Sequence, residues 1–161
     1  MKAVVVWTAA VAVALGGCTE GAPANGTEGA HSVAQAPLVG AWRLAWLEVP
    51  GTDGTLTRMT DAKGSLIYTP EGLVAVQVMF ARAANPSPNA PVQYAQDGYE
   101  ASFGRYVVDT ATRTVTHHYD GSLVRALLAQ DLPRRYELSE GRLTIRSTRS
   151  DEHWSVVWER Y

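Results

Sequence analysis

Two adjacent histidines, His117 and His118, are the side chains best suited to acid–base chemistry, because imidazole changes its charge near neutral pH. Neighbouring residues of a β-strand point to opposite faces, so the two rings do not converge on one metal ion. A zinc site needs three or four converging ligands, and the sequence shows no further cluster of suitable residue types. We therefore expect neither a metal nor another cofactor.

The residues around this pair assign the two histidines to different faces. Val115, His117 and Tyr119 form the more apolar set, so we expect His117 to point inward and His118 to face solvent. Two interpretations of His117 stay open. It contacts a ligand or transfers a proton, or it is a core histidine whose hydrogen bonds are satisfied within the protein.

Arg134 is the second candidate for ligand contact. It shares strand parity with Tyr136 and Leu138, and it points inward if they do. An internal guanidinium can hold a carboxylate through two parallel hydrogen bonds. The alternative is an internal ion pair or a charge at the rim, since a lone buried arginine is costly.

Three more polar side chains complete the predicted ligand-binding set, namely Gln77, Tyr68 and Tyr106. A tyrosine has an apolar ring and a polar tip, which suits a ligand cavity, although most strand tyrosines belong to a core or rim. Gln77 either donates a hydrogen bond in the pocket or faces solvent. For the apolar walls of the pocket we expect Trp46, Val76, Phe103, Val107 and Leu143.

The elements that position these residues are short β-rich runs separated by turn signals. We expect strands at residues 40–49, 64–69, 73–80, 101–109, 113–119, 133–138, 142–147 and 152–160. Eight strands joined mostly by tight turns predict an all-β fold, an eight-stranded up-and-down antiparallel barrel. Such an interior is filled by side chains or holds one small ligand.

Two longer connections, residues 81–98 and 122–130, are expected to add one or two short helical turns over one mouth of the barrel. A single β-bulge reverses every inward assignment beyond it. We expect one at Gly104.

The N-terminus predicts an exported chain. Lys2 precedes an apolar run over residues 3–15, and Leu15-Gly16-Gly17-Cys18 contains the only cysteine. This pattern predicts a signal peptide at residues 1–17. Residues 18–36 carry no aromatic side chain and are expected to form a flexible tether before a domain at residues 37–161. A cut elsewhere, or a short uncleaved anchor, are the alternatives.

The segment ending at Cys18 resembles the lipobox of bacterial lipoproteins. The resemblance implies that Cys18 carries lipid and anchors the chain in the bacterial cell envelope. In Gram-negative lipoproteins an aspartate directly after the cysteine favours retention in the inner membrane. This chain has Thr19 at that position. The resemblance therefore favours the periplasmic side of the outer membrane in a Gram-negative cell.

Six segments of the domain carry a family pattern: residues 38–44, which contain Gly40-Ala41-Trp42, and residues 64–72, 103–109, 115–122, 134–138 and 158–160. Together they resemble the bacterial and fungal lipocalin-like family of calycin-type barrels. In lipocalins an arginine near the last strand packs over the tryptophan of the first, which implies a structural pair of Arg160 and Trp42. The resemblance leaves the ligand and any activity open, because a fold does not fix a function.

Three functions are consistent with the sequence. The first is a lipid-anchored envelope protein that binds a small, mostly apolar or amphipathic ligand in the barrel lumen. The others are a small isomerase or cyclase that uses the same pocket, and a packed barrel that recruits an unspecified protein through its outer face. A net charge of −2 without a basic stripe argues against a nucleic-acid partner.

Overall fold

The computed structural model describes residues 37–51, 53, 55–81 and 93–161. Cys18, the expected signal peptide and the expected tether lie outside these residues. Within the described part of the chain, no helix has the length and apolar character needed to cross a membrane.

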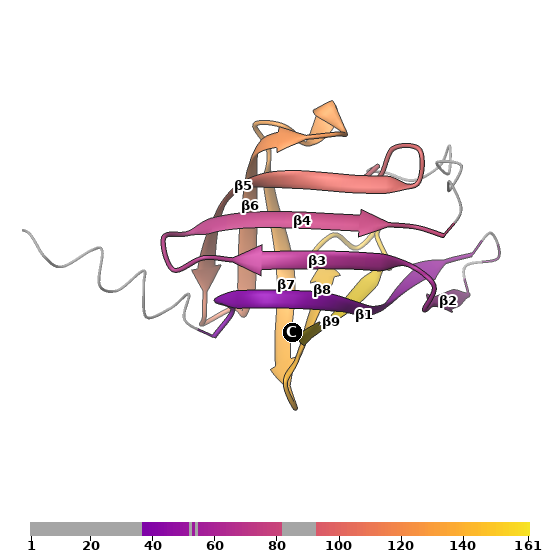
Figure 1. The fold of residues 1–161 in the computed structure, drawn as a ribbon, viewed down its shortest axis with the longest axis horizontal. Coiled ribbons are helices and arrows are strands. Elements are labelled where there is room, and N and C mark those ends of the chain that lie inside the picture. The colour runs from indigo at the N-terminus through magenta and orange to yellow at the C-terminus, as the bar shows by residue number, and fades with distance from the viewer. Residues whose placement is uncertain (1–36, 52, 54, 82–92) are drawn as a thin grey trace, which may run out of the picture.

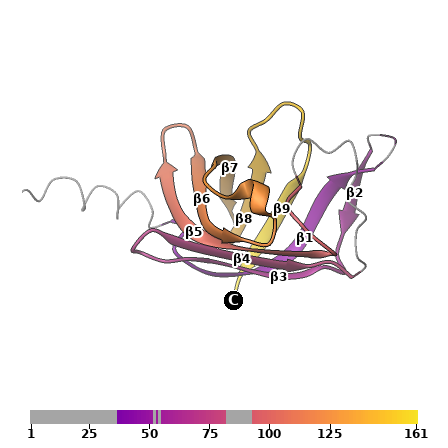
Figure 2. The ribbon, with the colours of Figure 1, turned by 90° about the horizontal axis from the view of Figure 1, so that it is seen from above.

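One antiparallel sheet curls into a closed barrel. Its strands follow the order β2-β1-β3-β4-β5-β6-β7-β8-β9, and β1 also pairs with β9. Figures 1 and 2 show β3 and β4 on one side of the barrel, with β7 and β8 on the other. The bounds are β1 Gly40–Pro50, β2 Leu56–Met59, β3 Lys63–Tyr68, β4 Leu73–Met79, β5 Tyr99–Asp109, β6 Thr114–Ser122, the 3₁₀ turn η1 Arg125–Leu127, β7 Asp131–Ser139, β8 Arg142–Ser147 and β9 Ser155–Arg160. The eight-stranded barrel is thereby confirmed, formed by β1 and β3 to β9.

The remaining strand, β2, was not predicted. It pairs only with the second half of β1, from Leu47↔Met59 to Pro50↔Leu56, and so extends the sheet beside the closed barrel. Of the two expected helical turns, residues 122–130 contain η1. Residues 93–98 do not form a helical turn where they are described, because Gln96 and Tyr99 pair across a tight turn instead.

The two ends of the barrel differ in their connections. Short turns join β3 to β4, β5 to β6 and β7 to β8 at the end where the domain begins, which we call the closed end. There the buried indole of Trp42 donates a hydrogen bond to the Leu38 carbonyl (2.9 Å). The Arg160 guanidinium lies 4.2 Å from the Trp42 ring centroid and donates to the Val39 carbonyl (3.0 Å). The contact that the resemblance implied is present.

Side chains alternate between the core and solvent along β4. Val74, Val76 and Val78 are buried, whereas Gln77 is exposed on the outer face. Gln77 has the opposite parity to its valine neighbours, and the pleat of the strand therefore turns it away from the interior. The prediction that Gln77 contacts a ligand in the lumen is wrong for this reason.

The same alternation corrects two of the predicted wall residues on β5. Tyr106 is buried, whereas Phe103 is 61% exposed and Val107 is 54% exposed. Because residues 103 and 107 have the opposite parity to residue 106, these three side chains cannot face the same cavity. Phe103 and Val107 lie on the outer surface.

The β-bulge expected at Gly104 occurs at that level of the barrel but on the neighbouring strand. Phe103 pairs with Gly121 and Gly104 pairs with Tyr119, so Asp120 of β6 is the extra residue. The parity of β5 is therefore unbroken, which keeps Tyr106 inside.

A second bulge reverses the parity of β1. Leu44 pairs with Trp158 and Trp46 pairs with Val157, which leaves Ala45 as the extra residue. Trp46 consequently lies outside, where the guanidinium groups of Arg58 and Arg142 stack on its ring at 4.6 and 5.4 Å. The prediction that Trp46 lines the pocket is wrong because this bulge turns the residue outward.

Candidate functional site

A cavity of about 420 Å³ occupies the barrel at the end opposite the closed one. This volume lies within the range of small-molecule sites, about 300–1,000 Å³. Its inner wall is mostly apolar and is built by Leu66, Val76, Val78, Ile145, Val156 and Trp158. Of the predicted wall residues Val76 lines the cavity, while Leu143 is fully buried in the core and does not reach it.

His117 and Arg134 both line the cavity, as strand parity predicted, and His118 is exposed beside Asp131. Tyr68 and Tyr106 do not reach it. They are buried beneath it with ring centroids 4.6 Å apart, and Tyr106 Oη donates to the Thr69 carbonyl (2.9 Å). The structure thus brings two of the five predicted ligand-binding residues to the cavity wall.

His117 lies between two tyrosine hydroxyl groups. Its Nε2 is 2.7 Å from Tyr68 Oη, and its Nδ1 is 3.2 Å from Tyr119 Oη. Burial, together with the smaller effect of the nearby Arg134 charge, lowers the pKa of His117 to about 3. The ring is therefore neutral at physiological pH with both nitrogens occupied. This geometry favours a satisfied core histidine over a proton-transferring one.

Arg134 is buried against two aromatic rings, which contact each other edge to face with centroids 5.6 Å apart. Its guanidinium carbon lies 4.8 Å from the Tyr94 ring centroid and 5.1 Å from that of Trp154. A cation over such rings is stabilised by their negative faces. Within the described residues no carboxylate lies within ion-pair distance of Arg134. The cation thus borders the cavity without an ion-pair partner from that part of the chain.

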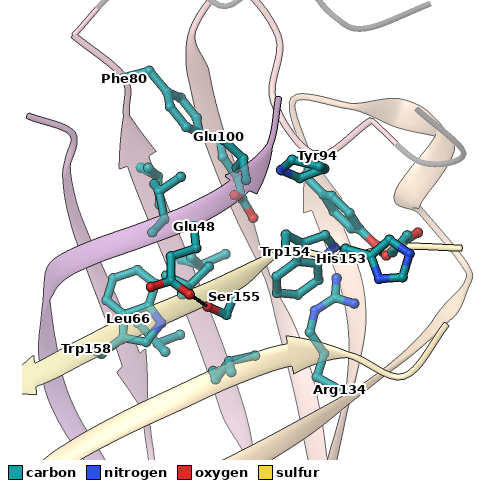
Figure 3. A pocket seen from close by; sticks show the side chains of 18 of the residues that line it. Glu48, Leu66, Phe80, Tyr94, Glu100, Arg134, His153, Trp154, Ser155 and Trp158 are labelled. Atoms are coloured by element: carbon teal, nitrogen blue, oxygen red, sulfur yellow. Dashed lines mark hydrogen bonds between the residues drawn. The ribbon is translucent and has the colours of Figure 1, made fainter. Parts of the chain in front are cut away.

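The two rings are held in place by the buried carboxylate of Glu152. It accepts hydrogen bonds from Tyr94 Oη (3.0 Å) and Trp154 Nε1 (2.9 Å). Arg149 Nε lies 3.2 Å from the other carboxylate oxygen. Glu152 therefore positions the two aromatic side chains that contact Arg134. Figure 3 shows Tyr94 and Trp154 beside the Arg134 guanidinium.

Glu100 also reaches into the cavity (Figure 3), and the sequence reasoning missed it. Burial raises its pKa to about 7, against the opposing effect of the Arg134 charge. Strand alternation could have predicted its inward direction, because residue 100 lies on the same face of β5 as the buried Ser102 and Tyr106. It was missed because the expected strand began at residue 101.

Trp158 is the second group that the reasoning missed. Its indole lines the cavity and is buried, and its Nε1 has no hydrogen-bond partner among the described residues. Its strand parity, which it shares with Arg160, could have placed it inside. An unpaired buried donor is costly, so an oxygen atom of a ligand would be stabilised here.

No group of three or more histidine, cysteine, aspartate or glutamate side chains gathers in a metal-binding arrangement within the described residues. What these residues present is an apolar chamber with a cation, an ionisable carboxyl and an indole donor on its wall.

A closed antiparallel barrel with an apolar cavity and a few convergent polar groups defines the class of small-ligand-binding β-barrels. A family model described as the lipocalin-like domain matches residues 39–161, and the chain belongs to this family. A comparison with curated proteins found no match. Membership of the family fits the binding of a small hydrophobic ligand.

Proposed function

We propose that this protein is a lipid-anchored envelope protein that holds a small amphipathic ligand in the cavity. The acidic end of the ligand lies at Arg134, and its apolar part lies along Val76, Val78 and Ile145. The observation that carries the proposal is a buried guanidinium, without a carboxylate partner among the described residues, on the wall of an apolar cavity.

The buried charge of Arg134 favours an anionic ligand. A buried charge is costly when it has no partner, and an incoming carboxylate supplies both the opposite charge and two hydrogen-bond acceptors. Tyr94 and Trp154 supply cation–π contacts to the guanidinium but no negative charge, so the charge of Arg134 is left for an anionic ligand group to neutralise.

The alternatives have less support. A packed barrel that acts through its outer face requires a filled interior, and the cavity of about 420 Å³ argues against it. An isomerase built on His117 requires a free ring nitrogen, and both nitrogens of His117 face tyrosine hydroxyl groups.

Replacing Arg134 by methionine is expected to weaken the binding of decanoic acid roughly 100-fold, because hydrogen bonds to a charged group contribute about 1.5–3 kcal/mol. The binding of decanol should change only a few-fold. Trp154 and Trp158 line the cavity, so their fluorescence reports both titrations.

Arg135→Met is the matched control, since Arg135 is exposed on the outer face of β7. It should leave both affinities unchanged. An equal loss of acid and alcohol binding in Arg134→Met would contradict the role of the charge. The absence of saturable binding of either compound to the wild type would overturn the proposed function.

The anchor in this proposal rests on the lipobox pattern, and we place it on the periplasmic side of the outer membrane in a Gram-negative host. Cys18→Ser is expected to abolish incorporation of labelled palmitate and to move the protein from the membrane to the soluble fraction of its host. Each buried methylene of an attached lipid contributes about 0.8 kcal/mol to membrane binding. Thr19→Ser should keep the label, and a labelled, membrane-bound Cys18→Ser protein would refute the anchor.

A further inference from the structure

Glu100 and Arg134 line one cavity without forming an ion pair. They come from β5 and β7, which flank β6 in the sheet. Both side chains are drawn at the cavity in Figure 3. In the described part of the chain, no salt bridge joins the two, and burial and the Arg134 charge are the effects that act on the Glu100 carboxyl. Glu100 therefore presents an uncommitted carboxyl to whatever occupies the space beside Arg134.

The other ionisable groups that line the cavity are Glu48, Tyr94, His117, Tyr119, Arg134, Asp151, Glu152 and His153. Glu48 accepts hydrogen bonds from Arg58 and Ser155, and Asp151 is paired with Arg149. The pKa of His117, at about 3, keeps its ring neutral, and burial raises the pKa of Tyr94 to about 12. Burial also raises the pKa of Tyr119. Glu152 is engaged by Tyr94, Trp154 and Arg149, and His153 is exposed at the mouth.

A ligand carboxylate on Arg134 would bring a second negative charge into the cavity that contains Glu100. Two carboxylates that share a poorly solvated site do not both stay ionised, because their repulsion raises the pKa of one of them. Arg134 stabilises the ionised form of the carboxylate that it contacts directly. The proton is therefore taken up by Glu100, which then has an O–H group to donate.

We propose that the cavity takes up an acidic amphipathic ligand together with one proton, which adds to the Glu100 carboxylate from solvent. This inference deepens the proposed function and rests on it. The proton uptake distinguishes acidic ligands from alcohols or esters of the same length, because a neutral ligand brings no charge and causes no proton to add to Glu100.

The direction of the pH dependence follows from the free and bound states. Burial places the pKa of free Glu100 at about 7, and the bound anion raises it further. Above about pH 7, free Glu100 is ionised and must gain a proton on binding, so the affinity for an acid falls up to roughly tenfold per pH unit. Below that pH, Glu100 is already protonated and the affinity levels off.

The test is calorimetric titration of the purified protein with decanoic acid and with decanol, each in two buffers of different ionisation heat. The wild type should take up a measurable fraction of one proton with decanoic acid at about pH 9 and almost none at about pH 6. With decanol it should take up none at either pH. This proton count on the wild type needs no variant.

Glu100→Gln should remove the proton uptake and keep decanoic acid binding as tight at about pH 9 as the wild type shows at about pH 6. Glu137→Gln is the matched control, because Glu137 is exposed on the outside of β7, and it should retain the wild-type proton count.

Saturable decanoic acid binding without proton uptake at about pH 9 would overturn the inference and leave the proposed function standing. Uptake that persists in Glu100→Gln, or that disappears in His153→Gln instead, would also overturn it. If neither decanoic acid nor decanol binds, both the inference and the proposed function fail.

Discussion

Replacing Trp42 by alanine is expected to lower the free energy of unfolding by about 3–5 kcal/mol, the usual cost of removing a buried tryptophan. Trp42 is 1% exposed, and its indole lies against the core at the closed end. The substitution removes the hydrogen bond to the Leu38 carbonyl and the surface under the Arg160 guanidinium, in addition to leaving a void. The first and last strands pair at this point, so the closure of the barrel is weakened directly.

Urea unfolding followed by far-ultraviolet circular dichroism measures this loss. Trp46→Ala is the control on the same strand, because Trp46 lies outside under Arg58 and Arg142. Its loss should stay below about 1.5 kcal/mol, since only exposed packing and cation–π contacts are removed. Equal losses for the two tryptophans would show that closure does not depend on Trp42.

Gly104→Ala is expected to cost at least about 3 kcal/mol, at the upper end of overpacking effects. A Cβ atom on Gly104 would clash with the His118 carbonyl oxygen and would lie 2.8 Å from the Asp120 nitrogen and the Tyr119 Cα. All three are backbone atoms at the bulge in β6, so no side chain can rotate to relieve the contact. The bulged strand itself must move.

Gly141→Ala provides the comparison. Its φ of +76° is unfavourable for alanine, but a Cβ atom there would meet no other atom within 4 Å. We expect a loss of about 1–2 kcal/mol from the backbone conformation alone. The two variants are compared by thermal unfolding, and a larger loss at Gly141 than at Gly104 would contradict the steric argument.

Strand alternation was enough to predict the barrel and the faces of its regular strands. It separated His117 from His118 on β6 and placed Arg134 inside on β7. It succeeded there because no β-bulge lies between these residues and the strand neighbours from which their faces were predicted. The strand β2 escaped prediction for a physical reason. Three of its four residues are exposed and none is buried, so it leaves no alternating pattern.

The bulge at Ala45 shows the limit of this reasoning. One extra residue turns Trp46 outward, and nothing in the local residue types distinguishes that outcome from continued alternation. The environment of Arg134 was equally hidden, because Tyr94 and Glu152 lie in connections rather than strands. Their positions depend on tertiary contacts between segments far apart in the chain, which periodicity does not encode.

The domain's first residues and the cavity lie at opposite ends of the barrel. Leu38 and Val39 lie at the closed end, held there by Trp42 and Arg160, and the cavity occupies the other end. With the proposed anchor at Cys18, the chain would therefore enter the domain away from the mouth of the cavity. Attachment to a membrane would leave that mouth unobstructed for the exchange of ligands.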